Sequence, residues 1–227
     1  MVQLFDIVIM ATPEIDIYTS CTLPNWGLYA SRHSYSLNVY DSKPLAKMHV
    51  NWSKIEHARR HLEASTAHWM VVADADTWVN TPERLLDDFV GTAAEKGQNF
   101  VFSSDISNWF GMLYPLNFLG VRECRRWICP NAGFFAVRNN AAGNRFMNDW
   151  IDLARGACAD IADTSPRDQW VLWRGLFGPQ PQLFRLDTTC VLRVISEFHW
   201  QHLVRTGRQP FIVHDKRLTE LYRRSRT

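Results

Sequence analysis

The chain has 227 residues, of which 46% are hydrophobic and 21% are charged. This length and composition predict one globular domain with a full hydrophobic core, and they exclude a disordered or collagen-like chain. The net charge is only +2 at pH 7 and basic side chains gather at the C-terminus, so we expect no nucleic-acid partner.

The apolar pattern alternates between strand and helix along the first half of the chain. We expect strands at 7–10, 36–40, 69–73 and 99–103. A helix is predicted at 53–63, where Ser53 and Glu56 have the spacing of a capping box, and another at 81–90, where Thr81 precedes Pro82. This alternation predicts an α/β fold whose mostly parallel sheet is flanked by helices.

The second half opens with an aromatic, loop-rich segment at 106–127, in which Trp109 and Trp127 could stack on sugars, as could Trp200 further on. A strand is expected at 134–137, followed by helices at 144–157 and 168–176. The last strand is predicted at 210–214, and a basic helix or frayed tail ends the chain.

The cysteines and the N-terminus bear on the cellular compartment. The five cysteines are scattered, which fits reduced thiols better than a disulfide framework or a zinc site. They are Cys21, Cys124, Cys129, Cys158 and Cys190. The apolar stretch at 4–10 contains Asp6 and lacks the basic region of a signal peptide, and no run reaches the roughly 18 apolar residues of a membrane span. We therefore expect a cytoplasmic protein.

Two carboxylates, Asp74 and Asp76, directly follow the predicted strand at 69–73. Strand periodicity points both to the same side, at the carboxyl edge where open α/β sheets bind ligands. Because neighbouring like charges repel, a divalent cation would stabilise this pair, and a diphosphate is the common ligand on such a cation's open side. Taken alone, a short acidic pair is more often a turn cap and a solvated side chain.

Small residues at Asn131, Ala132 and Gly133 suggest that the backbone there approaches another group closely, although a simple bulge would also need them. Asp168 and Gln169 begin a predicted helix and could hold sugar hydroxyls, or Asp168 could merely compensate the helix dipole.

Two side chains near the C-terminus could complete a metal and phosphate site. His214 ends the last predicted strand, where a ring nitrogen could bind a metal, and Lys216 could face a phosphate. An isolated histidine is more often a satisfied polar residue.

Taken together, these motifs resemble the GT-A nucleotide-sugar glycosyltransferases. Within that group the chain is similar to the galactosyl, mannosyl and xylosyltransferase family, which includes yeast Golgi enzymes and xyloglucan xylosyltransferases. The resemblance covers most of residues 5–216. It rests on segments 52–54, 69–80, 131–139, 168–169 and 213–216.

The resemblance implies a GT-A, Rossmann-like single domain over 1–227, with a nucleotide-binding half at 1–105 and a sugar and acceptor half at 106–227. Asp74 and Asp76 would form its DxD motif. Asp76 would bind Mn²⁺ or Mg²⁺ directly, Asp74 would help through ribose or water, and His214 would be the third protein ligand.

The resemblance also assigns the remaining binding residues. Residues expected to bind the nucleotide or its diphosphate are Ala11, Thr12, Pro13, Lys54, Ala75 and Lys216. Residues expected around the donor sugar and the acceptor hydroxyl are Asn131, Ala132, Gly133, Asp168 and Gln169. Members of the family are usually longer and membrane-anchored, so this chain looks like a compact relative or an excised catalytic domain.

The expected reaction moves a sugar from a nucleoside-diphosphate sugar, with UDP favoured, to a hydroxyl of a glycan acceptor. The resemblance favours retention of anomeric configuration. If a carboxylate base is needed, Asp105 and Asp168 are the candidates and the sequence does not choose between them.

Two other classes of function stay open. The aromatic richness would also suit a non-catalytic carbohydrate-binding module, in which Asp74 and Asp76 hold a structural cation. A nucleotidyltransferase or pyrophosphohydrolase would use the same metal and diphosphate chemistry. Kinases and dehydrogenases are disfavoured, because no glycine-rich phosphate loop is present.

Overall fold

A computed structural model describes residues 4–93, 95–104, 130–187, 191–192, 205 and 210–214. Several expectations therefore lie outside the described residues: the lobe at 106–127, the basic tail, and Asp105, Cys124, Cys129, Cys190, Trp200 and Lys216. No helix within the described ranges is both long and apolar enough to cross a membrane.

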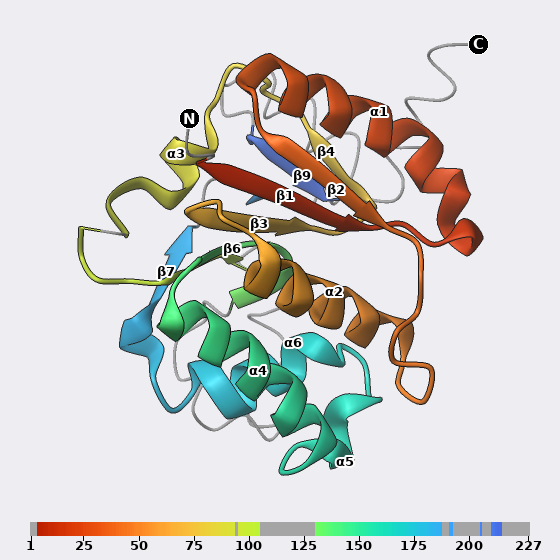
Figure 1. Ribbon diagram of the computed structural model, residues 1–227, viewed down its shortest axis with the longest axis vertical. Helices are drawn as coiled ribbons and strands as arrows, with labels where there is room; N and C mark the ends of the chain where they lie inside the picture. Colours follow the sequence, from red (N-terminus) through yellow and green to blue (C-terminus); the bar gives the residue numbers. More distant parts are fainter. Residues whose placement is uncertain are drawn as a thin grey trace.

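The main sheet has six strands in the order β2-β1-β3-β6-β5-β7. Their bounds are β1 Phe5–Met10, β2 Ser36–Tyr40, β3 Trp69–Ala73, β5 Phe100–Ser104, β6 Pro130–Arg138 and β7 Phe184–Asp187. β1 runs parallel to β2 and β3, and β5 runs parallel to β7, whereas β6 is antiparallel to both of its neighbours (Figure 1). The expected mixed, mostly parallel sheet is confirmed.

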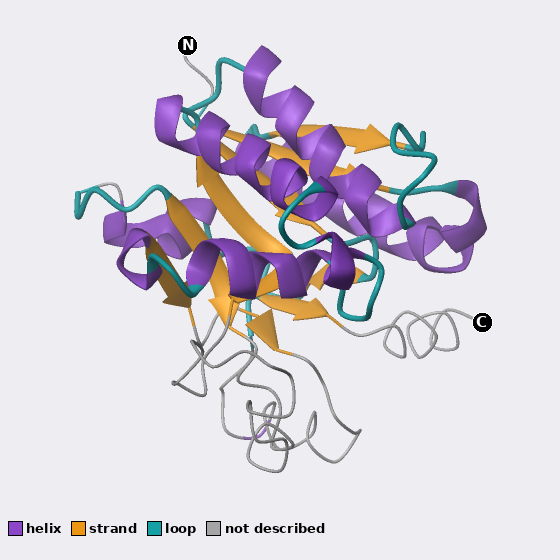
Figure 2. Ribbon diagram, turned by 90° about the horizontal axis from the view of Figure 1, so that it is seen from below, coloured by secondary structure: helices purple, strands orange, loops and turns teal. Residues whose placement is uncertain are grey.

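Helices cover both faces of this sheet. One face packs against α2 (Val50–Ala64), α4 (Ala141–Arg155) and α6 (Asp168–Val171), which continues as a π-helical segment over Leu172–Phe177. The other packs against α1 (Asp16–His33) and α3 (Leu86–Val90). In Figure 2, seen from below, helices cross in front of the strands. Short helical segments complete the fold at Pro13–Ile15, Gly91–Ala93, α5 Ala159–Ala162 and Pro181–Leu183.

A second, small sheet has the order β4-β9-β8. β4 (Thr77–Val79) begins just after the carboxyl end of β3 and pairs antiparallel with β9 (Ile212–His214), which in turn pairs with β8 (Val191–Leu192). Thr77 is opposite His214 in this register. The pairing therefore brings residues 210–214 next to the loop that follows β3.

The predicted capping box of the second helix is wrong. α2 begins at Val50, and the side chain of His49 caps it by accepting a hydrogen bond from the amide of Asn51 at 3.3 Å. Ser53 lies inside the helix and is fully buried, while Glu56 pairs with two arginines of the same helix, Arg59 and Arg60. The helix therefore begins about one turn before Ser53, which the capping-box spacing had marked as its start, and Ser53 lies on the buried face.

The start of α3 also differs from the prediction at Thr81. The amides of Asn80 and Thr81 bond to the carbonyl of Phe211, so these residues are held beside β9 rather than in a helix. A turn follows, in which the amide of Arg84 bonds to the carbonyl of Thr81, and the helix begins at Leu86. A long-range backbone contact has overridden the local Thr-Pro signal.

Candidate functional site

The loop at the carboxyl end of β3 carries Asp74, Ala75 and Asp76. The amide of Asp74 bonds to the carbonyl of Gly133 at 2.8 Å, and the amide of Thr77 bonds to the carbonyl of Asp74 at 3.0 Å. From α1, the hydroxyl of Thr22 donates to the carbonyl of Ala75 at 2.6 Å. Strand alternation was the wrong reason to expect both carboxylates on one side, because β3 ends at Ala73 and a turn brings them together.

Asp74, Asp76 and His214 form a group that we call the ligand triad. One potential ligand atom from each residue lies within 4.8 Å of the other two. The Nε2 atom of His214 is 3.2 Å from Oδ1 of Asp76 and 3.6 Å from Oδ2 of Asp74. The predicted metal ligands are thus side by side, although the histidine comes from the other end of the chain.

Gly133 makes room for the imidazole of His214. A Cβ atom at this position would overlap Cε1 and Nδ1 of His214 and would lie 2.9 Å from Oδ1 of Asn131. The same Asn131 oxygen accepts a hydrogen bond from the amide of Gly133 at 2.7 Å. The close approach expected at this glycine is therefore an approach to the histidine of the ligand triad.

The donor atoms of the ligand triad fit a divalent cation. Carboxylate oxygens suit Mg²⁺ and Mn²⁺, and an imidazole nitrogen suits transition metals, so the mixed set is compatible with Mn²⁺. Burial lowers the pKa of His214, but the hydrogen bond that its ring donates to Asp76 and the charges of Asp76 and Asp74 raise the pKa by more. A cation bound there would compete with that proton for the ring nitrogen.

Lys54 of α2 lies beneath the loop and joins it to α6. Its Nζ atom is 2.7 Å from Oδ1 of Asp74, 3.1 Å from Oδ2 of Asp168 and 2.9 Å from the carbonyl of Ala132. Burial lowers the pKa of Lys54, yet the charges of Asp168 and Asp74 raise it above its ordinary value. Three acceptors match the three donors of a charged ammonium group.

Asp168 and Gln169 lie against the start of β6. Oδ1 of Asp168 accepts a hydrogen bond from Asn51 at 3.3 Å, and the backbone carbonyl of Asp168 accepts one from the indole of Trp150 at 3.0 Å. The amide of Ala132 donates to Oε1 of Gln169 at 3.2 Å. With only 3% of its surface exposed, Asp168 is held on several sides.

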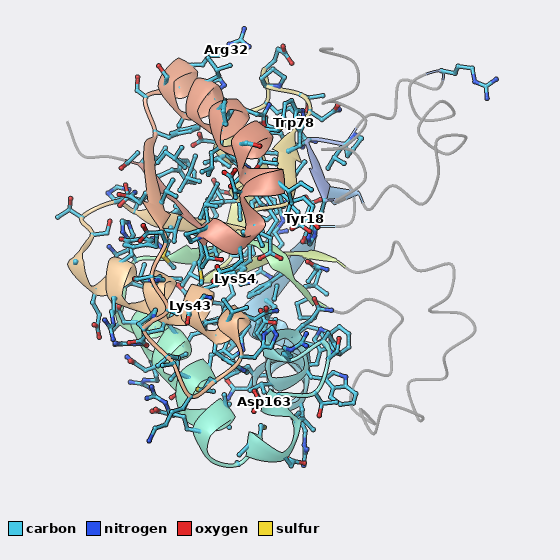
Figure 3. All side chains as sticks on the ribbon, turned by 90° about the vertical axis from the view of Figure 1, so that its right-hand side faces the viewer. Tyr18, Arg32, Lys43, Lys54, Trp78 and Asp163 are labelled. Atoms are coloured by element: carbon cyan, nitrogen blue, oxygen red, sulfur yellow. The ribbon has the colours of Figure 1, made fainter. Side chains whose placement is uncertain are left out.

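A cavity of about 210 Å³ lies beside the ligand triad. Its lining includes Thr12, Lys54 and the loop 74–76, which were expected there, and further residues that were not. The further residues are Met10, Ile15, Tyr18, Val50 and Asn51. Figure 3 labels Tyr18 on α1 and Lys54 on α2, the two helices that contribute to this lining. Ala11 and Pro13 flank Thr12 without lining the cavity.

An ion pair between Glu14 and Lys43 joins two segments that lead into elements lining this cavity. Glu14 lies in the short helix before α1, and Lys43 lies between β2 and α2. The hydrogen bond from Lys43 lowers the pKa of Glu14 to about 2. Neither residue was expected at the site, because no pattern links two exposed side chains from separate loops.

Comparisons with known proteins bear on the fold. No family model matches the chain, and no curated protein is similar to it in sequence. Among solved structures, the chain is similar to a glycosyltransferase involved in the glycosylation of the major capsid of PBCV-1. The TM-score is 0.63 at 16% identity, over 93% of this chain and 92% of the other.

Two further solved structures agree. The galactosyltransferase LgtC, in complex with donor and acceptor sugar analogs, gives a TM-score of 0.58 at 12% identity, over 93% of this chain and 87% of that one. Mouse xyloside xylosyltransferase 1, in its apo form, gives a TM-score of 0.52 at 8% identity, over 96% of this chain and 98% of that one. The chain has a glycosyltransferase fold. The GT-A-like architecture expected from the motifs is confirmed, and the narrower family stays a prediction.

Proposed function

We propose that this chain is a metal-dependent glycosyltransferase that moves a sugar from a nucleoside-diphosphate sugar to a hydroxyl of a glycan acceptor. UDP is the nucleotide we would test first. The observation that carries the proposal is the ligand triad at the edge of a cavity, in a chain with a glycosyltransferase fold. Fold alone does not define a reaction, so the argument depends on this site.

Asp74, Asp76 and His214 would hold Mn²⁺ or Mg²⁺. Such an ion supplies Lewis-acid stabilisation of the negative charge that develops on a departing diphosphate. The cavity lined by Thr12, Lys54 and Ala75 would enclose the nucleotide, with Ala11 and Pro13 shaping the loop around Thr12. In this assignment residues 1–105 bind the nucleotide. Lys216, which lies outside the described residues, remains a proposed partner of the diphosphate.

The donor sugar would lie against Asn131, Ala132 and Gly133 of β6 and against Asp168 and Gln169 of α6. Asp168 already contacts Lys54 and Asn51, so its carboxylate is oriented to accept hydrogen bonds from sugar hydroxyls. This role suits Asp168 better than that of a general base. Asp105, the other candidate base, lies outside the described residues.

In the retaining route that we favour, the acceptor oxygen bonds to the anomeric carbon on the face that the diphosphate leaves. The bond from that carbon to the diphosphate oxygen breaks, and the acceptor's proton passes to the departing diphosphate. No protein base is needed. The task of Asp168, Gln169 and Asn131 is then to fix the two hydroxyl-bearing partners in place.

The test is a panel of nucleotide sugars incubated with Mn²⁺, with released UDP, other diphosphates and free sugar measured. We expect cleavage of at least one donor, faster with an acceptor, and its loss in Asp76→Asn. The exposed Asp149→Asn on α4 is the matched control and should behave as the original protein does. Normal turnover by Asp76→Asn would overturn the proposal.

The same assay separates the alternatives. Release of a sugar 1-phosphate would indicate a pyrophosphohydrolase, and transfer of the nucleotide would indicate a nucleotidyltransferase. Thermal stabilisation by free sugars but by no nucleoside diphosphate would indicate a carbohydrate-binding module. The cytoplasmic location remains a prediction from the sequence.

A further inference from the structure

Arg167, the residue before Asp168, has a backbone conformation that a side chain rarely adopts. Its φ of 51° and ψ of −107° correspond to the first central position of a type II′ turn, where glycine is preferred. Hydrogen bonds hold it there: its amide bonds to the carbonyl of Thr164 at 2.6 Å, and its carbonyl accepts from the amide of Trp170 at 3.0 Å. Strain of this kind in a non-glycine residue is found mostly at functional sites.

One donor of the Arg167 guanidinium also lacks a partner. Its Nε atom is buried and has no hydrogen-bond partner. Among the described residues, no carboxylate forms an ion pair with Arg167, although Asp163 and Asp168 are close in sequence. A buried donor without a partner costs stability, so a residue that combines this cost with backbone strain calls for a functional explanation.

Contacts on either side of Arg167 in the sequence hold this segment beside the start of α2. Asp163 accepts a hydrogen bond from the amide of His49 at 3.4 Å, and Asp168 accepts one from the side chain of Asn51 at 3.3 Å. Burial, and then the charge of Arg167, lower the pKa of His49. His49 caps α2 through the amide of Asn51, which lines the cavity and donates to Asp168. Because Nδ1 of His49 accepts that bond, Nε2 of the neutral ring carries the proton and can donate.

An anion between these two donors would lie beyond Asp168 as seen from the ligand triad. Lys54 separates the two regions, since it contacts both Asp74 and Asp168. The diphosphate of a donor is already assigned to the ligand triad. An anion at Arg167 would therefore be a second acidic group of the substrate, and we take it to be carried by a sugar. The exposed Asp163 bonds to the backbone amide of His49, through its Oδ1 at 3.4 Å, rather than to the imidazole.

We propose that Arg167, assisted by His49, selects an acidic sugar by binding its carboxylate or phosphate group. This inference rests on the proposed glycosyltransferase function and adds a substrate class to it. The acidic group could belong to the transferred sugar or to the acceptor. An arginine fork suits either anion, because it can donate two parallel hydrogen bonds.

Two arms of one experiment distinguish these sources. In the donor arm, UDP release is compared between UDP-glucose and UDP-glucuronic acid, and between UDP-galactose and UDP-galacturonic acid. In the acceptor arm, the best donor is tested with neutral monosaccharides and with their uronic acids and 6-phosphates. We expect kcat/KM to favour the acidic member by about tenfold or more in one arm.

Arg167→Gln should remove most of that preference, and Arg167→Lys should keep part of it. Arg155→Gln, an exposed arginine at the end of α4, is the control and should keep the original ratio. Arg167→Gly should lose the preference while raising Tm, because glycine relieves the backbone strain. A purely structural arginine would instead lower Tm when it is replaced.

Equal ratios of acidic to neutral substrate in the original protein and in Arg167→Gln, with a donor that is cleaved, would overturn this inference alone. So would a loss of activity by Arg167→Gln that is the same for acidic and neutral substrates. If no nucleotide sugar is cleaved at all, the proposed function fails first, and the inference fails with it.

Discussion

Gly133 is the residue on which the position of His214 depends, because no Cβ atom fits between its backbone and the imidazole. We expect Gly133→Ala to displace His214 and to weaken Mn²⁺ binding by about tenfold or more, as changes next to metal ligands commonly do. Titration calorimetry with Mn²⁺ measures this directly.

The matched control is Gly27→Ala. A Cβ atom at Gly27 would meet nothing within 4 Å, and Gly27 lies inside α1. This variant should bind Mn²⁺ normally and gain up to about 1 kcal/mol of stability, since alanine is the better helix former. Equal Mn²⁺ affinity in both variants would show that the imidazole is not a ligand.

Lys54 is the buried charge that balances Asp74 and Asp168. In Lys54→Met both carboxylates lose their nearest cation, and we expect the free energy of unfolding to fall by about 3–5 kcal/mol. The exposed pair of Arg174 and Asp160 serves as the comparison, because Arg174→Met should cost less than about 1 kcal/mol. Urea unfolding measures both, and similar losses would contradict the burial argument.

Part of the site could be predicted from the types of its residues and their positions along the chain. Asp74 and Asp76 follow one apolar strand and His214 ends another, and such positions point to the edge of a sheet where ligands bind. The sequence did not point to Arg167, because the features that single it out are a backbone angle and a buried nitrogen without a hydrogen bond, and both belong to the three-dimensional structure. Asn51 likewise became visible only when α2 packed against α6.

At the scale of elements, the ion pair of Glu14 and Lys43 joins the loop before α1 to the loop before α2. The pKa of Glu14 is lowered from 4.5 to about 2, so the pair stabilises the folded state fully above pH 4.5. That contribution should disappear as the pH falls toward 2. In Lys43→Met, NMR titration of the Glu14 carboxyl should show its pKa raised toward the ordinary value, and an unchanged pKa would exclude Lys43 as the main cause.

The strands were predicted more accurately than the helices. Buried strands such as β3, and β1 apart from Asp6, are apolar along their length, which makes them easy to recognise. α1 was not predicted, because Pro24 and Gly27 lie inside it and its polar and apolar residues show little periodicity. β7 was also missed, because its Arg185 and Asp187 interrupt the apolar pattern.

At the scale of the molecule, two apolar cores lie on opposite faces of one sheet, and the cavity opens where the loops from both faces meet. A ligand bound there contacts α1, α2 and the loop after β3, so its binding should stabilise the whole domain. Saturation with UDP and Mn²⁺ at 100 times the dissociation constant should add about 2.7 kcal/mol. Scanning calorimetry should show a higher Tm that EDTA reverses.

Asp76→Asn is the control for this thermal shift and should gain little from UDP and Mn²⁺. A rise in Tm that survives EDTA would mean that the nucleotide binds without the metal. In that case the ligand triad would not be part of the nucleotide site.

The pairing of β4 with β9 positions His214 at the site, although β9 is not part of the main sheet. A polypeptide that stops just before His214 would still contain all six strands of the main sheet and both of its helical layers, yet it would lack the nitrogen that we propose as the third metal ligand. Such a polypeptide should therefore keep the main fold while losing its affinity for the metal, and with it the affinity for a nucleotide that depends on the metal.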